Sequence, residues 1–406
     1  MIAVWADGMR AGLLGRHGAN GTSFAPDPLA TPTAAVSLTM PVQLASYDIG
    51  YGLAPIFEMN LPEGSLREQL RLRFAKATAR FDDLDLLSIV GRSLLGRLRY
   101  AGIDEAPDAE LPFQSVDEIL SARREGGLFA WLMERYAPLS GIAGVQPKVL
   151  VRDPAKLSPG KLSDTTAIRS ATHIVKLWEP GLYPHLAANE YFCLQVATRL
   201  GLEVPPHTLS EDGSALVIER FDLADDRYLG LEDFCVLNAR GSARKYDGSI
   251  ETSLFKRLSQ FVAPDDRMAQ AAELWRRIVL NVALGNGDAH LKNFALTYPD
   301  VTGPAALSPV FDLVTTTAYL PGDQMALTLD GSTRWPDKAA LLALGRDRAG
   351  LSDRTMGAWF TAVADALSDT LPALQRWFAE SDAPEVGVAM GHRWQAWHGY
   401  TNGHWP

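Results

Sequence analysis

Asp288 and Asn293 are the residues whose types and spacing most directly suggest chemistry. They lie in the segment Gly285-Asn286-Gly287-Asp288-Ala289-His290-Leu291-Lys292-Asn293-Phe294, which follows an apolar pattern typical of a helix. The Gly-Asn-Gly run breaks a helix, so we expect Asp288 on a loop. A carboxylate there can take the proton of a hydroxyl, and an amide oxygen can bind a hard cation such as Mg²⁺. Asp and Asn also cap turns often, and this segment alone leaves both interpretations open.

A second acid, Asp312, ends the run Pro309-Val310-Phe311-Asp312. The apolar residues before it predict a strand, at whose end the carboxylate could bind a metal across from Asn293. His290 could touch a phosphate or organise the loop, but a structural histidine bonded to the backbone is at least as compatible with its position.

Lys176 is a lone cation in the strand-like run Thr172-His173-Ile174-Val175-Lys176-Leu177-Trp178. A lysine in an apolar strand is uncommon without an anionic partner, so phosphate is one expected partner. The alternative is a solvated lysine that protects an edge strand. Glu190 opens the next expected helix and could either pair with Lys176 or favour the positive end of that helix.

Two further segments flank this lysine. The first, Ser140-Gly141-Ile142-Ala143-Gly144-Val145-Gln146-Pro147-Lys148, has two glycines that would let backbone approach phosphate oxygens, although an ordinary turn has the same composition. The second, residues 214–222, is an apolar strand that becomes charged after an Asp-Gly hairpin signal. Its backbone could hydrogen-bond adenine, or it could be an edge strand that runs into a loop.

The order of these features is more informative than any one of them. Protein kinases present a glycine loop, a strand lysine, a helix glutamate, a hinge, a catalytic Asp with an Asn five residues later, and a metal-binding Asp, in that order. The sequence therefore predicts in-line phosphoryl transfer from Mg-ATP to a hydroxyl. Asp288 would be the base, Asn293 and Asp312 the metal ligands, and Lys176 a phosphate contact.

The surrounding pattern predicts an α+β, bilobal, protein-kinase-like fold in three regions. Residues 1–110 begin with strand-like runs at 2–5 and 36–40 and end in helices, which suggests an accessory α/β subdomain. Residues 111–260 contain short strands and would form the kinase N-lobe with the glycine loop, strand lysine and hinge. Residues 261–406 follow a helical period and would form an all-helical C-lobe.

Composition narrows the functional class. The 406 residues are 47% hydrophobic and 21% charged, as in globular proteins, and the net charge of −10 disfavours direct nucleic-acid binding. Cys193 and Cys235 lack metal-ligand spacing, so neither a disulfide framework nor a zinc site is expected. No secretory leader or membrane-spanning run is apparent, and we expect a cytoplasmic protein without membrane contact.

The chain resembles the HipA toxin-kinase family. Matching stretches are 142–148, 172–177, 189–191, 217–222, 232–235, 287–294 and 309–312, and residues 38–41 and 60–64 resemble the accessory domain of that family. The resemblance implies a fold related to phosphoinositide kinases and the same roles for the residues above. It places the nucleotide against Ala143, Gly144, Val145, Gln146, Lys148, Lys176, Glu219, Arg220, Phe221, His290 and Phe311, with the backbone of 219–221 at adenine.

The resemblance also implies partners. Members typically phosphorylate an aminoacyl-tRNA synthetase, often the glutamyl enzyme, which arrests translation and growth. They are restrained by a helix-turn-helix, HipB-like antitoxin whose dimer binds operator DNA, so this acidic chain would reach DNA only indirectly. Two other functions stay open: a nucleotide-binding partner of the antitoxin with little catalysis, and a small-molecule or lipid kinase.

One departure concerns self-regulation. The family commonly carries an autophosphorylated serine directly before the Val/Ile-Ala-Gly of the glycine loop, and Gly141 occupies that position here. Ser140, one residue earlier, is then the candidate autophosphorylation site, because a flexible Gly-flanked loop could present it. Pro147, in place of an acidic residue, would stiffen the loop.

Overall fold

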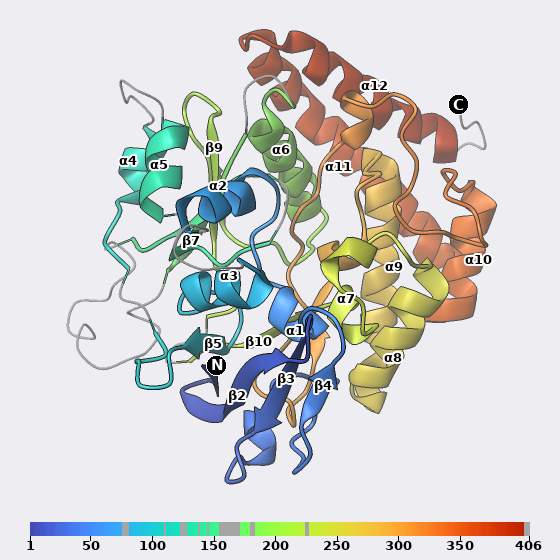
Figure 1. The fold of residues 1–406 in the computed structure, drawn as a ribbon. Coiled ribbons are helices and arrows are strands. Elements are labelled where there is room, and N and C mark those ends of the chain that lie inside the picture. Colours follow the sequence, from blue (N-terminus) through green and yellow to red (C-terminus); the bar gives the residue numbers. More distant parts are fainter. Residues whose placement is uncertain are drawn as a thin grey trace. The chain divides into compact units, whose positions relative to one another are not determined.

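The computed structural model describes residues 1–74, 81–108, 111–121, 128–136, 139–143, 146–153, 171–178, 183–223 and 227–401 (Figure 1). The chain forms two compact units that alternate along the sequence. The first unit contains residues 1–178, 206–243 and 295–305, and the second contains 179–205, 244–294 and 306–406. The expected boundaries near residues 110 and 260 stay predictions.

The first unit begins with an antiparallel five-stranded sheet in the order β4-β3-β2-β1-β5. Tight turns join β1 to β2 and β2 to β3, and Gly8 supplies a positive φ of 76° in the first of these turns. The expected strand at 36–40 is wrong, because there only Ser37 and Met40 form an isolated bridge. The strands are β1 (Ile2–Ala6), β2 (Met9–His17), β3 (Gly21–Pro26), β4 (Tyr47–Ile49) and β5 (Leu98–Ala101).

A second sheet of the first unit has the order β6-β7-β9-β8. Its strands are β6 (Lys148–Val151), β7 (His173–Leu177), β8 (His207–Leu209) and β9 (Ala215–Glu219). A separate pair is formed by β10 (Gly230–Asp233) and β11 (Ala295–Tyr298). The helices are α1 (Pro55–Glu58), α2 (Gly64–Phe74), α3 (Asp83–Val90), α4 (Val116–Leu120), α5 (Leu128–Tyr136) and α7 (Phe234–Leu237).

One hydrophobic core serves both sheets of this unit. Val149, Val175 and Val217, from three adjacent strands of the second sheet, belong to the same buried cluster as Phe57 and Tyr100 of the N-terminal region. Because side chains alternate along a strand, residues next to these valines lie on the opposite face of the sheet. Residues on both sides of position 110 therefore fold around a common core.

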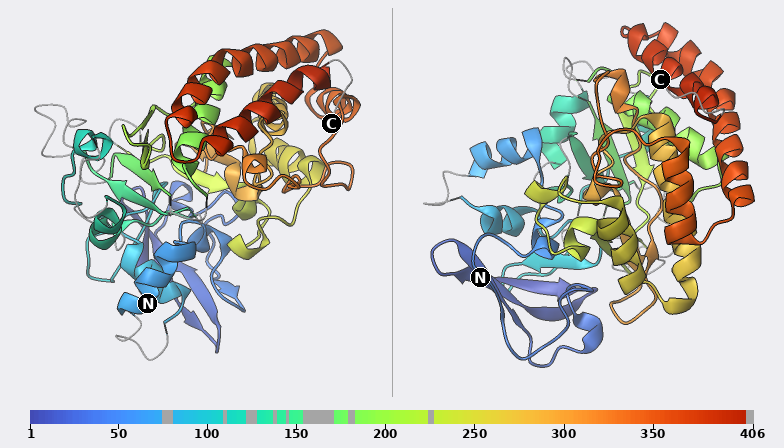
Figure 2. Two further views of the ribbon diagram at one scale, coloured as in Figure 1. Left: turned by 90° about the horizontal axis from the view of Figure 1, so that it is seen from above. Right: turned by 90° about the vertical axis from the view of Figure 1, so that its right-hand side faces the viewer.

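The second unit is mainly helical. Side-chain caps mark two helix starts: Asp337 accepts a hydrogen bond from the amide of Ala340, and Ser352 accepts one from Thr355. Helices α11 and α12 pack along each other (Figure 2). The helices are α6 (Leu186–Arg199), α8 (Arg257–Phe261), α9 (Arg267–Leu284), α10 (Lys338–Ala349), α11 (Asp353–Ala379) and α12 (Pro384–Thr401), with a π-helical segment at Ile250–Lys256.

These elements confirm the expected mixed α+β fold with a helical C-terminal region, but residues 261–406 are not all-helical as expected, because they contain β11 (Ala295–Tyr298) and the short strand β12 (Ala306–Leu307). Trp394 and Trp397 on α12 are almost fully buried, and their indole N–H groups donate to Thr315 Oγ1 and to the carbonyl of Phe360. Both tryptophans thus pack the helical unit, as expected. Within the described ranges, no helix has the length and apolar character needed to cross a bilayer.

Candidate active site

The loop that carries Asp288 starts where α9 ends, in the second unit. Gly285 caps α9 with a left-handed φ of 71°, which confirms the expected helix stop. A Cβ at this position would lie 2.5 Å from Thr317 Oγ1 and 2.6 Å from Arg393 Nε. Arg393 of α12 donates to the carbonyl of Val282 at 2.6 Å and so holds the last turn of the helix. Glycine is needed here for both its conformation and its small size.

The loop backbone is fixed by bonds from several segments. Asn286 donates to Asn281 Oδ1 at 2.7 Å and accepts from the amide of Asp288 at 3.1 Å. The amide of Gly287 donates to Thr316 Oγ1 at 2.7 Å. The amide of Leu291 donates to the carbonyl of Lys245 at 3.1 Å. A loop bound at so many points can present its side chains in one geometry.

Asp288 is half-exposed, with 49% of its side-chain surface accessible. Its Oδ1 accepts a hydrogen bond of 2.7 Å from the hydroxyl of Tyr246. This bond comes from a side chain and not from a backbone amide of the turn, which argues against a role limited to turn capping. The structure therefore places a carboxylate on an accessible loop, as the sequence predicts, and its catalytic role stays a prediction.

Asn293 and His290 lie beside this carboxylate. Asn293 ends the 3₁₀ turn Leu291–Asn293, and its Oδ1 is buried without a hydrogen-bond partner. His290 is also buried, its Nε2 lies 4.0 Å from Asp288 Oδ1, and its Nδ1 has no partner, so the expected alternative of a backbone bond is not seen there. Burial lowers the pKa of His290 to about 4, which keeps the ring neutral at neutral pH.

Asp312 joins the same group of residues. It adopts a left-handed φ of 54° in an irregular segment, whereas the strand before it, β12 (Ala306–Leu307), ends five residues earlier, so the expected strand-end position is wrong. Asp tolerates this conformation better than most residues. The negative charge of Asp312 acts on His290 and opposes the fall in the pKa of that ring. Asn286 of the loop also donates to the Asp312 carbonyl at 3.5 Å, so Asp312 lies beside the loop.

Helix α6 supports the Asp312 segment. Buried Asn189 bonds to the backbone of Thr315 in both directions: Asn189 Oδ1 accepts from the Thr315 amide at 2.8 Å, and Nδ2 donates to its carbonyl at 3.1 Å. The next residue, Glu190, is buried in the second turn of α6, which begins at Leu186. Because the helix dipole acts within the first turn, the helix-end alternative for Glu190 is not supported.

These oxygen donors fit a magnesium ion. Mg²⁺ usually takes one or two carboxylates from the protein and completes its shell with water and substrate phosphates. Asp312 supplies one carboxylate, and the unpartnered Asn293 Oδ1 supplies a second oxygen. No cluster of three His, Cys, Asp or Glu side chains occurs in the part of the chain that the structure describes. A metal at these residues would therefore depend on phosphate oxygens as well.

The first unit presents two lysines side by side. Lys148 of β6 is paired with Lys176 of β7 in the antiparallel register, and both are buried, with 4% and 3% of their surfaces accessible. Strand β7 lies between β6 and β9, so the edge-strand alternative for Lys176 is wrong. Two cations at directly opposed positions of neighbouring strands could both reach one anionic group.

The glycine segment before β6 is described only in part. Gly144 and Val145 lie outside the described residues, whereas Ala143 is half-buried and Gln146 has a buried Nε2 without a hydrogen-bond partner. An amide donor in this place could bind a phosphate oxygen. The predicted nucleotide contacts of this segment stay predictions.

Ser140 and Gly141 both have packing roles. Ser140 is fully buried, donates to the carbonyl of Tyr136 at 2.7 Å and accepts from the amide of Leu150 at 2.8 Å. A Cβ at Gly141 would lie 1.8 Å from Leu94 Cδ2, so this fold has no room for the family's serine. Phosphorylation of Ser140 stays a prediction, and it requires this segment to open.

The expected hinge follows β9. The amide of Glu219 donates to the carbonyl of Pro206 at 2.9 Å, and the amide of Arg220 donates to that of Thr172 at 3.0 Å. The backbone amides of the first two hinge residues are thus already used within the first unit. An adenine contact in this segment would have to use carbonyl groups or Phe221, which is half-buried.

The Arg220 side chain has a structural role that the sequence did not indicate. It is buried and forms a bidentate pair with Asp222, with bonds of 2.9 and 2.6 Å. It also donates to the carbonyls of Leu94 and Ala171 at 3.0 and 3.2 Å. A buried guanidinium with this many partners holds segments together and is not available to a ligand.

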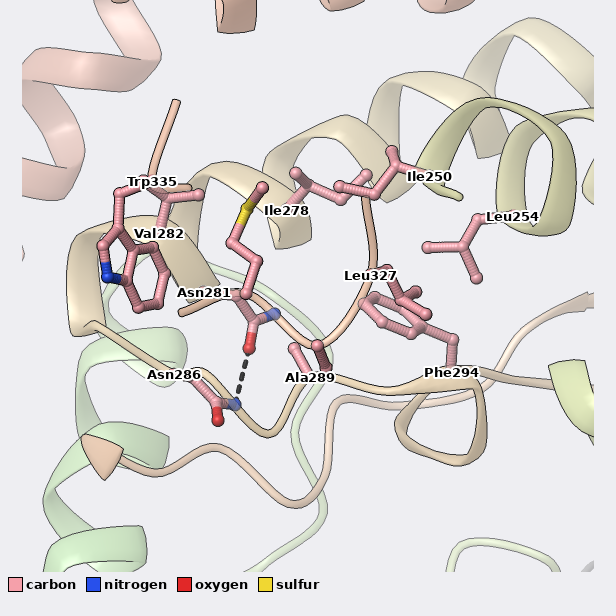
Figure 3. Close-up of a pocket in the computed structure, with 12 residues that line it drawn as sticks. Ile250, Leu254, Ile278, Asn281, Val282, Asn286, Ala289, Phe294, Leu327 and Trp335 are labelled. Atoms are coloured by element: carbon pink, nitrogen blue, oxygen red, sulfur yellow. Dashed lines mark hydrogen bonds between the residues drawn. The ribbon is translucent and has the colours of Figure 1, made fainter. Parts of the chain in front are cut away.

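An apolar pocket lies beside the Asp288 loop (Figure 3). Asn281 and Asn286 form its polar side through their mutual hydrogen bond, and Ala289 and Phe294 of the loop contribute apolar surface. The other lining residues are Ile250, Leu254, Ile278, Val282, Met325, Ala326, Leu327 and Trp335. The pocket therefore backs the loop with apolar side chains.

Sequence reasoning missed Tyr246, Thr316 and Asn189 at this site. Tyr246 is 42 residues from Asp288, Thr316 is 29 from Gly287, and Asn189 is 126 from Thr315. Contacts over such separations follow no local period. Only the polar character of the Lys245-Tyr246-Asp247 segment could have indicated a functional loop.

Two family models and several known proteins match this chain. Residues 140–371 match the model of the HipA-like C-terminal domain, and residues 2–101 match the HipA N-terminal domain. Two proteins of Sinorhizobium fredii, described as putative kinases Y4dM and Y4mE, are 31% and 30% identical over 67% and 79% of this chain. The matches span 64% and 78% of those relatives.

A solved structure supports the same relationship at the level of fold. The complex of Shewanella oneidensis HipA, HipB and operator DNA contains a chain that matches 99% of this one over 98% of its own length, with a TM-score of 0.66 and 19% identity. One family model covers residues 2–101, and the other covers residues 140–371, which are more than half of the chain. The chain therefore belongs to the HipA family.

Proposed function

We propose that this protein is an ATP-dependent kinase that transfers the γ-phosphate to a serine or threonine of another protein. The observation that carries the proposal is that Asp288 and Asn293 share one anchored loop and that Asp312 lies beside it, with its carbonyl accepting from Asn286 Nδ2 at 3.5 Å, while Asn293 Oδ1 has no hydrogen-bond partner. Kinases need a base and oxygen ligands for magnesium in this arrangement. The description of two relatives as putative kinases supports the same activity.

The residues of the second unit have distinct proposed roles. The Asp288 carboxylate accepts the proton of the acceptor hydroxyl while the oxygen forms its bond to phosphorus and the bond to the ADP oxygen breaks. Its half exposure lets a protein hydroxyl reach it. His290 stays neutral, so it adds no positive charge that would weaken the base. Asn293 and Asp312 would hold Mg²⁺, which neutralises phosphate charge when bound.

The first unit would supply the cations for the nucleotide. Lys148 and Lys176 lie opposite each other in adjacent strands and present two ammonium groups on one face of the sheet. We propose that they bind phosphate oxygens of ATP, and that Ala143 to Gln146 cover the phosphates. The amide of Gln146 is a donor suited to that role.

Family membership also suggests the biological setting. The Shewanella oneidensis HipA structure is a complex with HipB and operator DNA, and we propose a comparable helix-turn-helix antitoxin for this chain. A net charge of −10 fits a protein that reaches DNA through a partner. The proposed substrate is a cytoplasmic aminoacyl-tRNA synthetase, with the glutamyl enzyme as first candidate. Phosphorylation would then arrest translation.

The test is replacement of Asp288 by alanine. Transfer of labelled phosphate from ATP to proteins of a dialysed bacterial extract should fall by about 100-fold or more, because general-base catalysis is lost. Asp353→Asn is the matched control, since Asp353 is an exposed carboxylate on α11 that accepts a bond from Arg346 at 2.8 Å. Thermal unfolding should show that both variants keep the fold.

Two results would contradict the proposal. Unchanged transfer by Asp288→Ala would remove Asp288 from the chemistry. ATP binding by the wild-type protein without any transfer would instead indicate a nucleotide-binding partner of the antitoxin.

A further inference from the structure

Tyr246 makes a contact with the proposed base that neither the kinase pattern nor the comparisons assign. Its hydroxyl donates to Asp288 Oδ1 at 2.7 Å, although the two residues are 42 positions apart. Tyr246 is 50% accessible, and Asp288 is accessible to a similar degree. A short bond between two half-exposed side chains needs support from the surrounding structure, because water competes for both groups.

The structure provides that support from several directions. The ring of Tyr246 packs edge-to-face on His290, with centroids 5.2 Å apart and an interplanar angle of 77°. The carbonyl of the preceding Lys245 accepts from the amide of Leu291 at 3.1 Å, which joins the two segments directly. The carbonyl of Tyr246 accepts from Gly248 at 3.0 Å in a tight turn. Tyr246 is thus attached to the Asp288 loop through its ring and its hydroxyl, and the backbone of the preceding Lys245 is bonded to the same loop.

The consequence concerns the orientation of the carboxylate. An aspartate on an exposed loop can rotate about its terminal torsion, which is broad and has no strong staggered preference. A donor fixed on Oδ1 restricts that rotation and points the second oxygen in a defined direction. Restricting a catalytic group before the substrate arrives lowers the entropic part of the barrier.

We propose that Tyr246 is a positioning residue for phosphoryl transfer, whose hydroxyl holds Asp288 Oδ1 so that Oδ2 faces the acceptor hydroxyl. This inference rests on the proposed kinase function. Tyr246 itself neither accepts the phosphate nor takes the proton. Its effect should therefore appear in the rate of transfer and not in the affinity for ATP.

Two other interpretations of the same contact make different predictions. If the phenol blocked the base, its removal would speed the transfer, because the acceptor would no longer have to displace it. If the phenol were itself the acceptor, the protein would gain a phosphate on Tyr246. The direction of the rate change and the mass of the residue separate these interpretations from positioning.

The test uses Tyr246→Phe in the full chain, which removes the hydroxyl and keeps the ring on His290. With Mg-ATP and the proteins of a dialysed bacterial extract, the maximal rate should fall by about 10-fold, and the KM for ATP should stay within about twofold of wild type. Tyr47→Phe is the matched control, because it removes a phenol hydroxyl that bonds to the carbonyl of Pro41 at 2.6 Å in the N-terminal sheet. It should behave as wild type.

Tyr246→Leu tests whether the ring contributes as well. If only packing matters, Tyr246→Phe will match wild type while Tyr246→Leu is slow, and this result overturns the inference. A faster Tyr246→Phe, a change confined to the KM, or phosphate on Tyr246 by mass spectrometry overturns it too. Wild-type protein that transfers no phosphate overturns the proposed function itself, whereas an active wild type with an unaffected Tyr246→Phe overturns only the positioning role.

Discussion

The strand pair of the first unit and the Asp288 loop of the second unit position their charged side chains in different ways. Lys148 and Lys176 are opposed because the register of β6 and β7 pairs them, and the backbone ladder alone is enough for that. Asp288 depends on side chains from distant segments, among them Tyr246 and Thr316, which bonds to the neighbouring Gly287. Cations on strands are thus fixed by backbone pairing, and a base on a loop is fixed by contacts of individual side chains.

The glycines of the two regions are required for different reasons. Gly141 is required because Leu94 packs against it, which is a matter of core volume. Gly285 and Gly287 are required because polar side chains of the second unit, Arg393 and Asp323, approach the loop backbone. A defect at Gly141 should therefore affect stability, whereas a defect at the loop should affect stability and catalysis together.

The largest expected effect separates the two regions by kinetics. Asp312→Asn should lower the maximal rate by about 100-fold, because it removes a metal-binding charge that acts in the transition state. Lys176→Met should mainly raise the KM for ATP, by about 10-fold, because a charge-assisted bond to phosphate contributes to binding. Initial rates over a range of ATP and Mg²⁺ concentrations give the maximal rate and the KM for ATP of each variant. A KM effect for Asp312→Asn with an unchanged maximal rate would contradict the assigned roles.

The next effect compares glycines. Gly141→Ala and Gly287→Ala should each lower the free energy of unfolding by about 2–3 kcal/mol, since a Cβ would lie 1.8 Å from Leu94 Cδ2 or 2.1 Å from Asp323 Oδ2. Only Gly287→Ala should also slow phosphate transfer by the folded protein. Urea unfolding and rate measurements on the same samples distinguish the two outcomes.

Gly357→Ala serves as the control for these substitutions. Gly357 lies inside α11 with open space around its added Cβ, so alanine should stabilise the helix by about 0.5–1 kcal/mol. Equal losses of activity in Gly141→Ala and Gly287→Ala would show that the two regions do not differ as argued.

The smallest expected effect is a pH dependence of stability from His290. Burial lowers its folded pKa to about 4 from an ordinary value of 6.5. Between these values the unfolded chain binds a proton that the folded protein does not. The stability that depends on neutral His290 is therefore fully present above pH 6.5, and the free energy of unfolding falls as the pH drops toward 4.

His290→Gln should remove that dependence. Between about pH 7.5 and pH 5, wild type should lose about 2 kcal/mol more of its unfolding free energy than the variant, as measured by urea unfolding at both pH values. The exposed His17→Gln is the control and should keep the wild-type dependence. Parallel losses in wild type and His290→Gln would mean that other groups determine the acid sensitivity.

Local chemistry in the sequence was enough to predict part of the site. The Gly-Asn-Gly run ended α9 at Leu284 and put Asp288 on a loop, because glycine alone adopts the left-handed cap without a steric penalty. The apolar runs around Lys176 and residues 215–219 predicted β7 and β9, because a short continuous apolar run is typical of a strand that is buried on both faces. The sequence could not establish that β7 is internal, since strand order depends on pairing with distant segments.

The path of the Asp312 segment and the contacts of Asp288 were decided by the tertiary structure. The local run before Asp312 suggested a strand end, but the paired contacts of Asn189 with Thr315 hold this segment in an irregular path. The sequence left Asp288 as either a base or a turn cap, and it gave no sign of the bond from Tyr246. Short-range patterns determine where elements begin and end, whereas the orientation of a side chain on a loop depends on residues that only folding brings together.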